Sequence, residues 1–143
     1  MTTEQDNIEC FEAVAAGLLA HFYSNFPRPV MIDAAGFEQR LIEDGILPSH
    51  CPWPERPGSP GQTLTSETMK WLIEEGIVRC QGSSRSSFAG AVLTAKGFAA
   101  LNQPIIDQPE KQTIGRGLKN IGRHTAKAVT ESLISGFIQL AIR

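Results

Sequence analysis

The segment 64–101 constrains the fold more than any other part of the chain, because the spacing of its apolar residues changes twice. It reads LTSETMKWLIEEGIVRCQGSSRSSFAGAVLTAKGFAAL. The first part repeats apolar residues at helical intervals, and Met69 and Leu72 lie on the expected inner face. Residues 77–80 and 88–93 then have the composition of two strands joined by a polar Gly/Ser loop, which is typical of a hairpin.

End signals mark the two helices of this segment. Thr65 or Ser66 can cap the first helix, which we expect to end at Gly76. Thr94 can cap the second, shorter helix. The segment therefore predicts a helix, a hairpin and a helix in direct succession.

Two more helices and a strand are predicted before this segment. Residues 6–25 repeat apolar side chains at helical spacing, which predicts an amphipathic helix. The run 30–32 can form an edge strand, and Asp33 can cap a helix that ends near Gly45. Five prolines in 48–61 exclude a continuous helix or a central strand, so this insertion is predicted to be a loop that Trp53 pins to the body.

The C-terminal part has a different composition. Pro104 and Pro109 mark a linker over 104–112, after which 113–142 predicts one long amphipathic helix. Its apolar stripe is predicted to pack on the body of the chain or on a second subunit, and it is the candidate oligomer or partner face. This stripe is made of Leu118, Ile121, Val129, Leu133, Phe137 and Leu140. Its basic stripe is predicted to make the tail contact, through Arg116, Lys119, Arg123 and Lys127. Three glycines in the first half weaken this helix, so packing has to support it.

Charge is distributed unevenly along the chain. Residues 1–110 contain 7 Lys+Arg against 14 Asp+Glu, a balance of −7, and 111–143 contain 6 against 1, a balance of +5. The chain therefore has an acidic body and a basic tail. The acidic N-terminal stretch does not resemble a secretory signal, no stretch is long and apolar enough to span a bilayer, and we expect a cytoplasmic protein.

Residues with catalytic or ligating side chains form no known signature. Three cysteines, Cys10, Cys51 and Cys80, match no paired spacing, so we expect free and mostly buried thiols. His50-Cys51 lacks a second pair of ligands, and we assign no metal site. The histidines lie in separate elements and no nucleophile motif is present, so we expect neither enzymatic activity nor a cofactor.

The end of the segment 64–101 carries a family resemblance. Leu93, Thr94, Lys96, Gly97 and Leu101 form the pattern LTxKGxxxL, and with ETMKWLIEEGIVR and the Ser/Gly loop they resemble bacterial winged-helix proteins, broadly of the MarR and PadR kind. The resemblance covers roughly 6–102. It implies a mainly α chain with a small β-hairpin (α+β), in which a winged helix-turn-helix domain over 1–103 precedes the C-terminal helix of 113–143. The Pro-rich insertion and the acidic body depart from this pattern.

Two functions follow as expectations. The resemblance implies a regulator that contacts duplex DNA through its third helix and wing, using Ser66, Thr68, Lys70, Arg79, Ser84 and Arg85. The tail helix would make it a homodimer. However, Glu67, Glu74 and Glu75 make the third helix acidic, which opposes phosphate binding. The alternative is an adaptor for a protein partner or, less favoured, an anionic membrane surface, contacted by the basic amphipathic tail.

Overall fold

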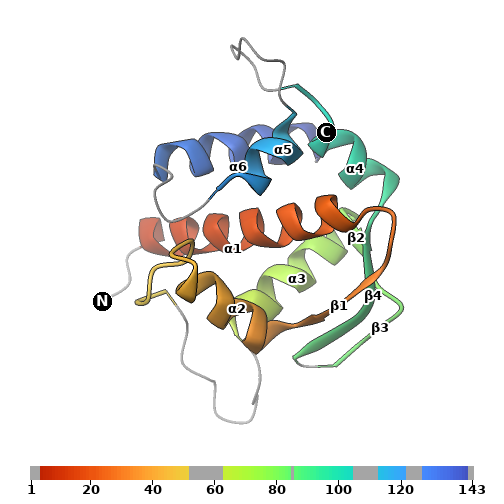
Figure 1. The fold of residues 1–143 in the computed structure, drawn as a ribbon, viewed down its shortest axis with the longest axis horizontal. Helices are drawn as coiled ribbons and strands as arrows, with labels where there is room; N and C mark the ends of the chain where they lie inside the picture. Colours follow the sequence, from red (N-terminus) through yellow and green to blue (C-terminus); the bar gives the residue numbers. More distant parts are fainter. Residues whose placement is uncertain (1–3, 52–62, 85, 105–112, 122–126, 142–143) are drawn as a thin grey trace.

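The computed structural model describes residues 4–51, 63–84, 86–104, 113–121 and 127–141. It is mainly helical with one small antiparallel sheet, so the predicted α+β class is confirmed (Figure 1). The elements in chain order are α1 (Glu4–Asn25), β1 (Val30–Asp33), α2 (Ala34–Glu43), α3 (Leu64–Glu74), β2 (Val78–Arg79), β3 (Gly82–Ser83), β4 (Ser87–Leu93), α4 (Ala95–Leu101), α5 (Ile114–Lys119) and α6 (Lys127–Ala141).

The sheet follows the predicted strands closely. β4 is its centre, and β1 and β2 pair antiparallel with it on either side, with Val30 opposite Ala91 and Val78 opposite Leu93. The edge strand predicted at 30–32 is therefore confirmed. The loop predicted between the hairpin strands contains one further short strand, β3, which also pairs with β4.

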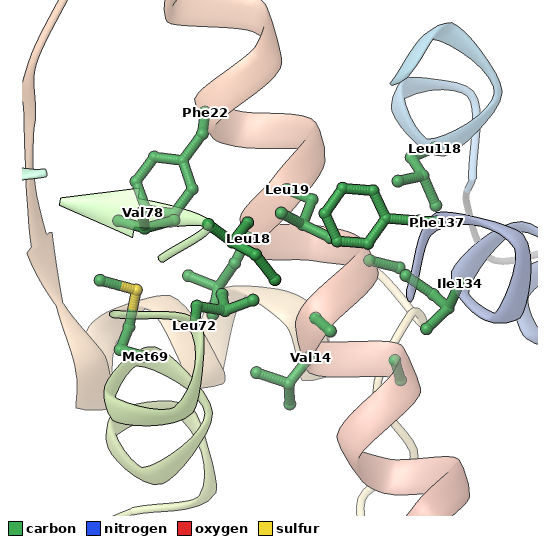
Figure 2. Packing of buried hydrophobic residues seen from close by; sticks show 14 of the residues in the cluster. Val14, Leu18, Leu19, Phe22, Met69, Leu72, Val78, Leu118, Ile134 and Phe137 are labelled. Carbon is green, nitrogen blue, oxygen red and sulfur yellow. The ribbon is translucent and has the colours of Figure 1, made fainter. Parts of the chain in front are cut away.

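Helix α1 is the centre of the molecule. Figure 2 shows Leu18 and Phe22 directed toward Met69 and Leu72 of α3, while Leu19 on the other side of α1 meets Phe137 of α6. The helix lies between the α3 layer and the α5–α6 layer in Figure 1. A helix covered on both sides has to be apolar around most of its circumference, which explains why α1 is rich in Ala, Leu, Val and Phe.

The predicted single helix over 113–142 is two helices in the structure. α5 ends at Lys119, where the backbone N–H of the C-cap Asn120 bonds to the carbonyls of Gly117 and Leu118, and α6 begins only at Lys127. Gly115 and Gly117 lower the intrinsic helix propensity of this segment. The short helix α5 therefore depends on its packing against the rest of the chain. Gly115 lies against the Tyr23 ring of α1, where a Cβ atom would approach within 2.7 Å.

The apolar stripe of the tail packs within its own chain. Leu118, Leu133 and Phe137 are buried, Ile121 is half-buried and Leu140 is 37% exposed, while the side chain of Val129 lies outside the described residues. α5 packs against α1, and α6 packs against both α1 and α4. The prediction of an oligomer or partner face is therefore corrected for Leu118, Leu133 and Phe137, because the core of the monomer already buries these side chains.

The start of α3 also differs from the prediction. Its N-cap is Thr63, whose side chain accepts a hydrogen bond from the Ser66 N–H at 3.2 Å, while the Ser66 hydroxyl accepts one from the Thr63 N–H at 2.8 Å. This reciprocal capping box places the cap two or three residues earlier than Thr65 or Ser66. The predicted ends of α2 and α3 are confirmed, since Gly45 and Gly76 have φ angles of 75° and 74°.

A buried carboxylate joins α2 to α3. Glu38 accepts hydrogen bonds from the backbone N–H of Thr65 at 2.9 Å and from the Thr65 hydroxyl at 3.0 Å. The N–H of Thr65 belongs to the first turn of α3, which has no acceptor within its own helix and carries the positive end of the helix dipole. Glu38 of α2 therefore provides a hydrogen-bond acceptor for an N–H group in the first turn of α3.

We expect Glu38→Ala to lower the free energy of unfolding by about 2–3 kcal/mol, because it leaves a buried N–H and a buried hydroxyl without their acceptor. Glu38→Gln keeps an acceptor oxygen and should cost less. Denaturant unfolding monitored by circular dichroism measures both. Gln39→Ala, at the exposed neighbouring position, should stay within about 0.5 kcal/mol of the parent protein. Equal losses for Glu38→Ala and Gln39→Ala would contradict this role.

Candidate functional site

Two of the residues predicted to contact DNA are buried. Ser66 is 0% exposed and Thr68 is 2% exposed. The Ser66 hydroxyl belongs to the capping box, and the Thr68 hydroxyl donates to the Leu64 carbonyl at 2.8 Å. Both side chains are buried and hydrogen-bonded within the chain, so their assignment to base contacts is corrected.

The other predicted DNA contacts differ in their exposure to solvent. Lys70 is half-buried on α3, and Arg79 and Ser84 are exposed on the hairpin. The Ser84 hydroxyl accepts from the Ser87 N–H at 3.2 Å, which stabilises the hairpin turn. Arg85 lies outside the described residues. Only Lys70, Arg79 and Ser84 therefore stay available as surface contacts among the described members of this set.

The predicted tail contacts lie on another side of the molecule. Arg116 and Lys119 are exposed on α5, while Arg123 and the side chain of Lys127 lie outside the described residues. In Figure 2 the α5 side chain Leu118 lies across α1 from the α3 and β2 side chains. The α5 cations are therefore separated from Lys70 by the central helix, and do not offset the acidic residues of α3.

The solvent-facing side of α3 is a single stripe. Glu67, Lys70, Trp71 and Glu74 follow one another at helical spacing, and all four are exposed or half-buried. Two carboxylates and one ammonium give this stripe an acidic balance. An acidic stripe repels phosphate and attracts a basic partner.

A largely apolar pocket of about 410 Å³ borders this stripe. It is lined by Asn7, Ile8 and Phe11 of α1 and by Leu64, Glu67, Thr68 and Trp71 of α3. The Trp71 ring meets the Phe11 ring edge-on, with centroids 5.3 Å apart, and Trp71 is half-buried rather than fully in the core. Ile8 is 55% exposed. Nothing in the spacing of the sequence indicated that the first turns of α1 would complete a pocket beside Trp71.

A second cluster lies where the segment after α2 meets α1. Cys10 and Cys51 form a disulfide, so the prediction of three free thiols is wrong for these two. Cys80 is free, and its thiol donates to the carbonyls of Gly82 and Ala89. The fold supplies the reason, because residues 44–51 return to α1 and bring two cysteines 41 positions apart to a Cα–Cα distance of 5.6 Å.

His50 completes this cluster. One ligating atom from each of Cys10, His50 and Cys51 lies within 4.8 Å of the others. A pocket of about 210 Å³ beside them is lined by both His50 and Cys51. Thiolate sulfur and imidazole nitrogen are the donors that zinc prefers, so these are described residues that could hold a metal ion.

A third pocket surrounds His21 of α1. It measures about 220 Å³, and its charged lining residues are Arg40, Asp44 and Lys119. The His21 ring packs edge-on against Phe37, with centroids 5.6 Å apart. Burial, and secondarily the positive charge of Arg40, lower the pKa of His21 below 6.5.

Acid should destabilise the fold through His21. Because its pKa is lower in the folded state, the unfolded chain binds a proton first as the pH falls through 6.5, and the free energy of unfolding decreases. His21→Gln should reduce this acid-side loss. Unfolding measured at about pH 8 and about pH 5.5 gives the comparison, with the value at about pH 8 as the reference because both states are then neutral. An identical acid-side loss in parent and variant would contradict the assignment.

Searches against protein-family models, curated proteins and solved structures found no match to this chain. Among the described residues, the helices are too short or too polar to cross a bilayer.

Proposed function

We propose that the chain is a winged-helix module that binds a segment of another protein through the pocket between α1 and α3. The winged-helix assignment is supported by the order α1–β1–α2–α3–β2–β4 and by the central position of β4 between β1 and β2. The predicted protein partner thus moves from the basic tail to the opposite side of α1.

The observation that carries the proposal is an open apolar pocket with an acidic border. Ile8 and Trp71 expose apolar surface, and Glu67 lines the same pocket. Aromatic side chains at the centre of a patch and charges at its border are typical of protein interfaces. The pocket volume suits one large apolar side chain, since about 410 Å³ lies at the small end of ligand sites.

The acidic charge around the pocket indicates which charged residues the partner carries. Glu67 and Glu74 belong to the α3 stripe, and the body over 1–110 has a charge balance of −7. A complementary segment carries Lys or Arg beside its apolar anchor, because opposite charges steer the encounter and like charges are excluded. The proposed ligand class is therefore a short basic segment with one Leu, Phe or Trp side chain.

Selection from a displayed library of random peptides, against the full-length oxidised protein, tests this function. We expect the enriched peptides to combine an apolar anchor with Lys or Arg, and Ile8→Ser to weaken their binding at least about tenfold, a loss of about 1.4 kcal/mol. Met31→Ser is the matched control, because Met31 is 65% exposed on β1 and does not line the pocket. Enriched peptides that bind the Ile8→Ser and Met31→Ser variants equally well, or the failure of any peptide to enrich, would contradict the proposal.

DNA association is the second candidate function. It is supported by the helix and hairpin order and by the exposure of Arg79 and Ser84 on the hairpin. In this case binding to any duplex should weaken steeply as salt rises, and Arg79→Ala should weaken it further.

A further inference from the structure

The two cysteines of the Cys10–His50–Cys51 cluster are positioned by regular backbone structure. Cys10 is held in the second turn of α1, and the Cys51 N–H bonds to the Pro48 carbonyl at 3.0 Å in a turn after α2. Cys10 and Cys51 are 1% and 3% exposed, whereas His50 is exposed. The two cysteines are therefore shielded from bulk solvent, while the imidazole beside them is accessible.

The spacing of the three donors suits a tetrahedral ion. Zinc bonds of about 2.0–2.3 Å place neighbouring ligand atoms roughly 3.3–3.8 Å apart. The three donor atoms already lie within 4.8 Å of one another, so an imidazole shift of about 1 Å and separation of the sulfurs after reduction produce this geometry.

We propose that, once the Cys10–Cys51 disulfide is reduced, Cys10, His50 and Cys51 bind one Zn²⁺ ion. The same residues then alternate between a disulfide and a metal site. A dithiol reductant supplies two electrons and two protons, so that the S–S bond becomes two thiols and the reductant becomes a disulfide. Zn²⁺ binding then displaces the two thiol protons and leaves two zinc-bound thiolates and a neutral imidazole.

The adjoining pocket supplies access and the fourth ligand. Cys51 is 3% exposed but lines the pocket of about 210 Å³ together with His50, so this pocket is the side from which a small dithiol approaches the disulfide. A water molecule in the same pocket completes the tetrahedron, as in zinc sites that keep an open position. This site goes beyond the proposed protein-binding function, because it uses neither Ile8 nor Trp71.

Zinc competition with a chromogenic chelator tests the proposal. We expect the full-length protein, reduced with a phosphine and freed of metal, to bind one Zn²⁺ per chain, and the oxidised protein to bind none at the same site. Cys51→Ser and His50→Ala should weaken the affinity by at least the 10- to 100-fold that loss of an outer partner typically costs. Cys80→Ser should bind zinc as the parent does, because Cys80 lies on the hairpin segment.

Thermal unfolding of the reduced protein provides a second readout. Zinc should raise the Tm of the reduced parent and of Cys80→Ser, because a ligand that binds only the folded state stabilises it. It should leave the Tm of His50→Ala nearly unchanged. The proposal is overturned if the reduced parent binds zinc no better than the Cys10→Ser/Cys51→Ser variant, or if zinc binding survives in Cys51→Ser but not in Cys80→Ser. It is equally overturned if the reduced chain unfolds and zinc does not restore its structure.

Discussion

Phe137→Ala should lower the free energy of unfolding by about 3–5 kcal/mol, because it removes a large aromatic side chain from the core. Phe137 is 1% exposed and packs with Leu19, Ile134 and Leu118, where α6 and α5 cover α1 (Figure 2). Chemical denaturation of the purified protein measures the loss.

Leu140→Ala is the matched control for this prediction. Leu140 is on the same helix but 37% exposed, so its truncation should cost far less than that of Phe137. Sedimentation of both variants shows whether the apolar stripe of α6 packs within the monomer or against a second subunit. A small stability loss in Phe137→Ala accompanied by dissociation of a dimer would mean that this face packs against a second subunit.

Reduction of the disulfide should cost about 4 kcal/mol, because a cross-link between residues 41 positions apart restricts the unfolded chain by about that amount. The comparison is made between oxidised and reduced protein in the presence of a metal chelator, so that zinc does not compensate. Cys80→Ser keeps the disulfide and should show the same loss on reduction. Equal stability of oxidised and reduced parent protein would contradict this contribution.

The local elements of the fold followed from the sequence. Helical and strand periods, the Asp33 and Thr94 cap positions and the glycines after α2 and α3 depend on neighbouring residues, and the structure agrees with each of them. The hairpin and the edge strand β1 were predicted for the same reason. Two local features were misplaced. The cap of α3 was placed too late, because Thr63, Thr65 and Ser66 all have suitable side chains and only the three-dimensional structure distinguishes them. The single helix predicted over 113–142 is interrupted after Lys119.

The non-local features did not follow from the sequence. An amphipathic stripe such as that containing Leu133 and Phe137 packs equally well on its own body or on a copy, and periodicity does not distinguish these partners. The disulfide depends on the return of residues 44–51 to α1, which no cysteine spacing encodes. The α3 site was wrong in part for the same reason, since Ser66 and Thr68 are polar residues whose hydrogen bonds lie inside the fold.

Burial of those two residues changes the balance between the two functions. Because Ser66 and Thr68 are buried, the solvent-facing stripe of α3 consists of Glu67, Lys70, Trp71 and Glu74. The cations of α5 lie across α1 and contribute little there. What stays on the surface is an aromatic pocket with an acidic border, which suits a basic protein segment better than a phosphate backbone.

Paired titrations at low ionic strength test this central proposal most directly, with a selected peptide and a random-sequence duplex offered to the same protein. The account predicts that the peptide binds, that Glu67→Lys weakens it at least about tenfold, and that added salt reduces this difference. It also predicts that the duplex binds the parent no better than it binds Arg79→Ala. Tight duplex binding that falls steeply with salt and is lost in Arg79→Ala, together with peptide affinity unchanged by Glu67→Lys, would contradict it.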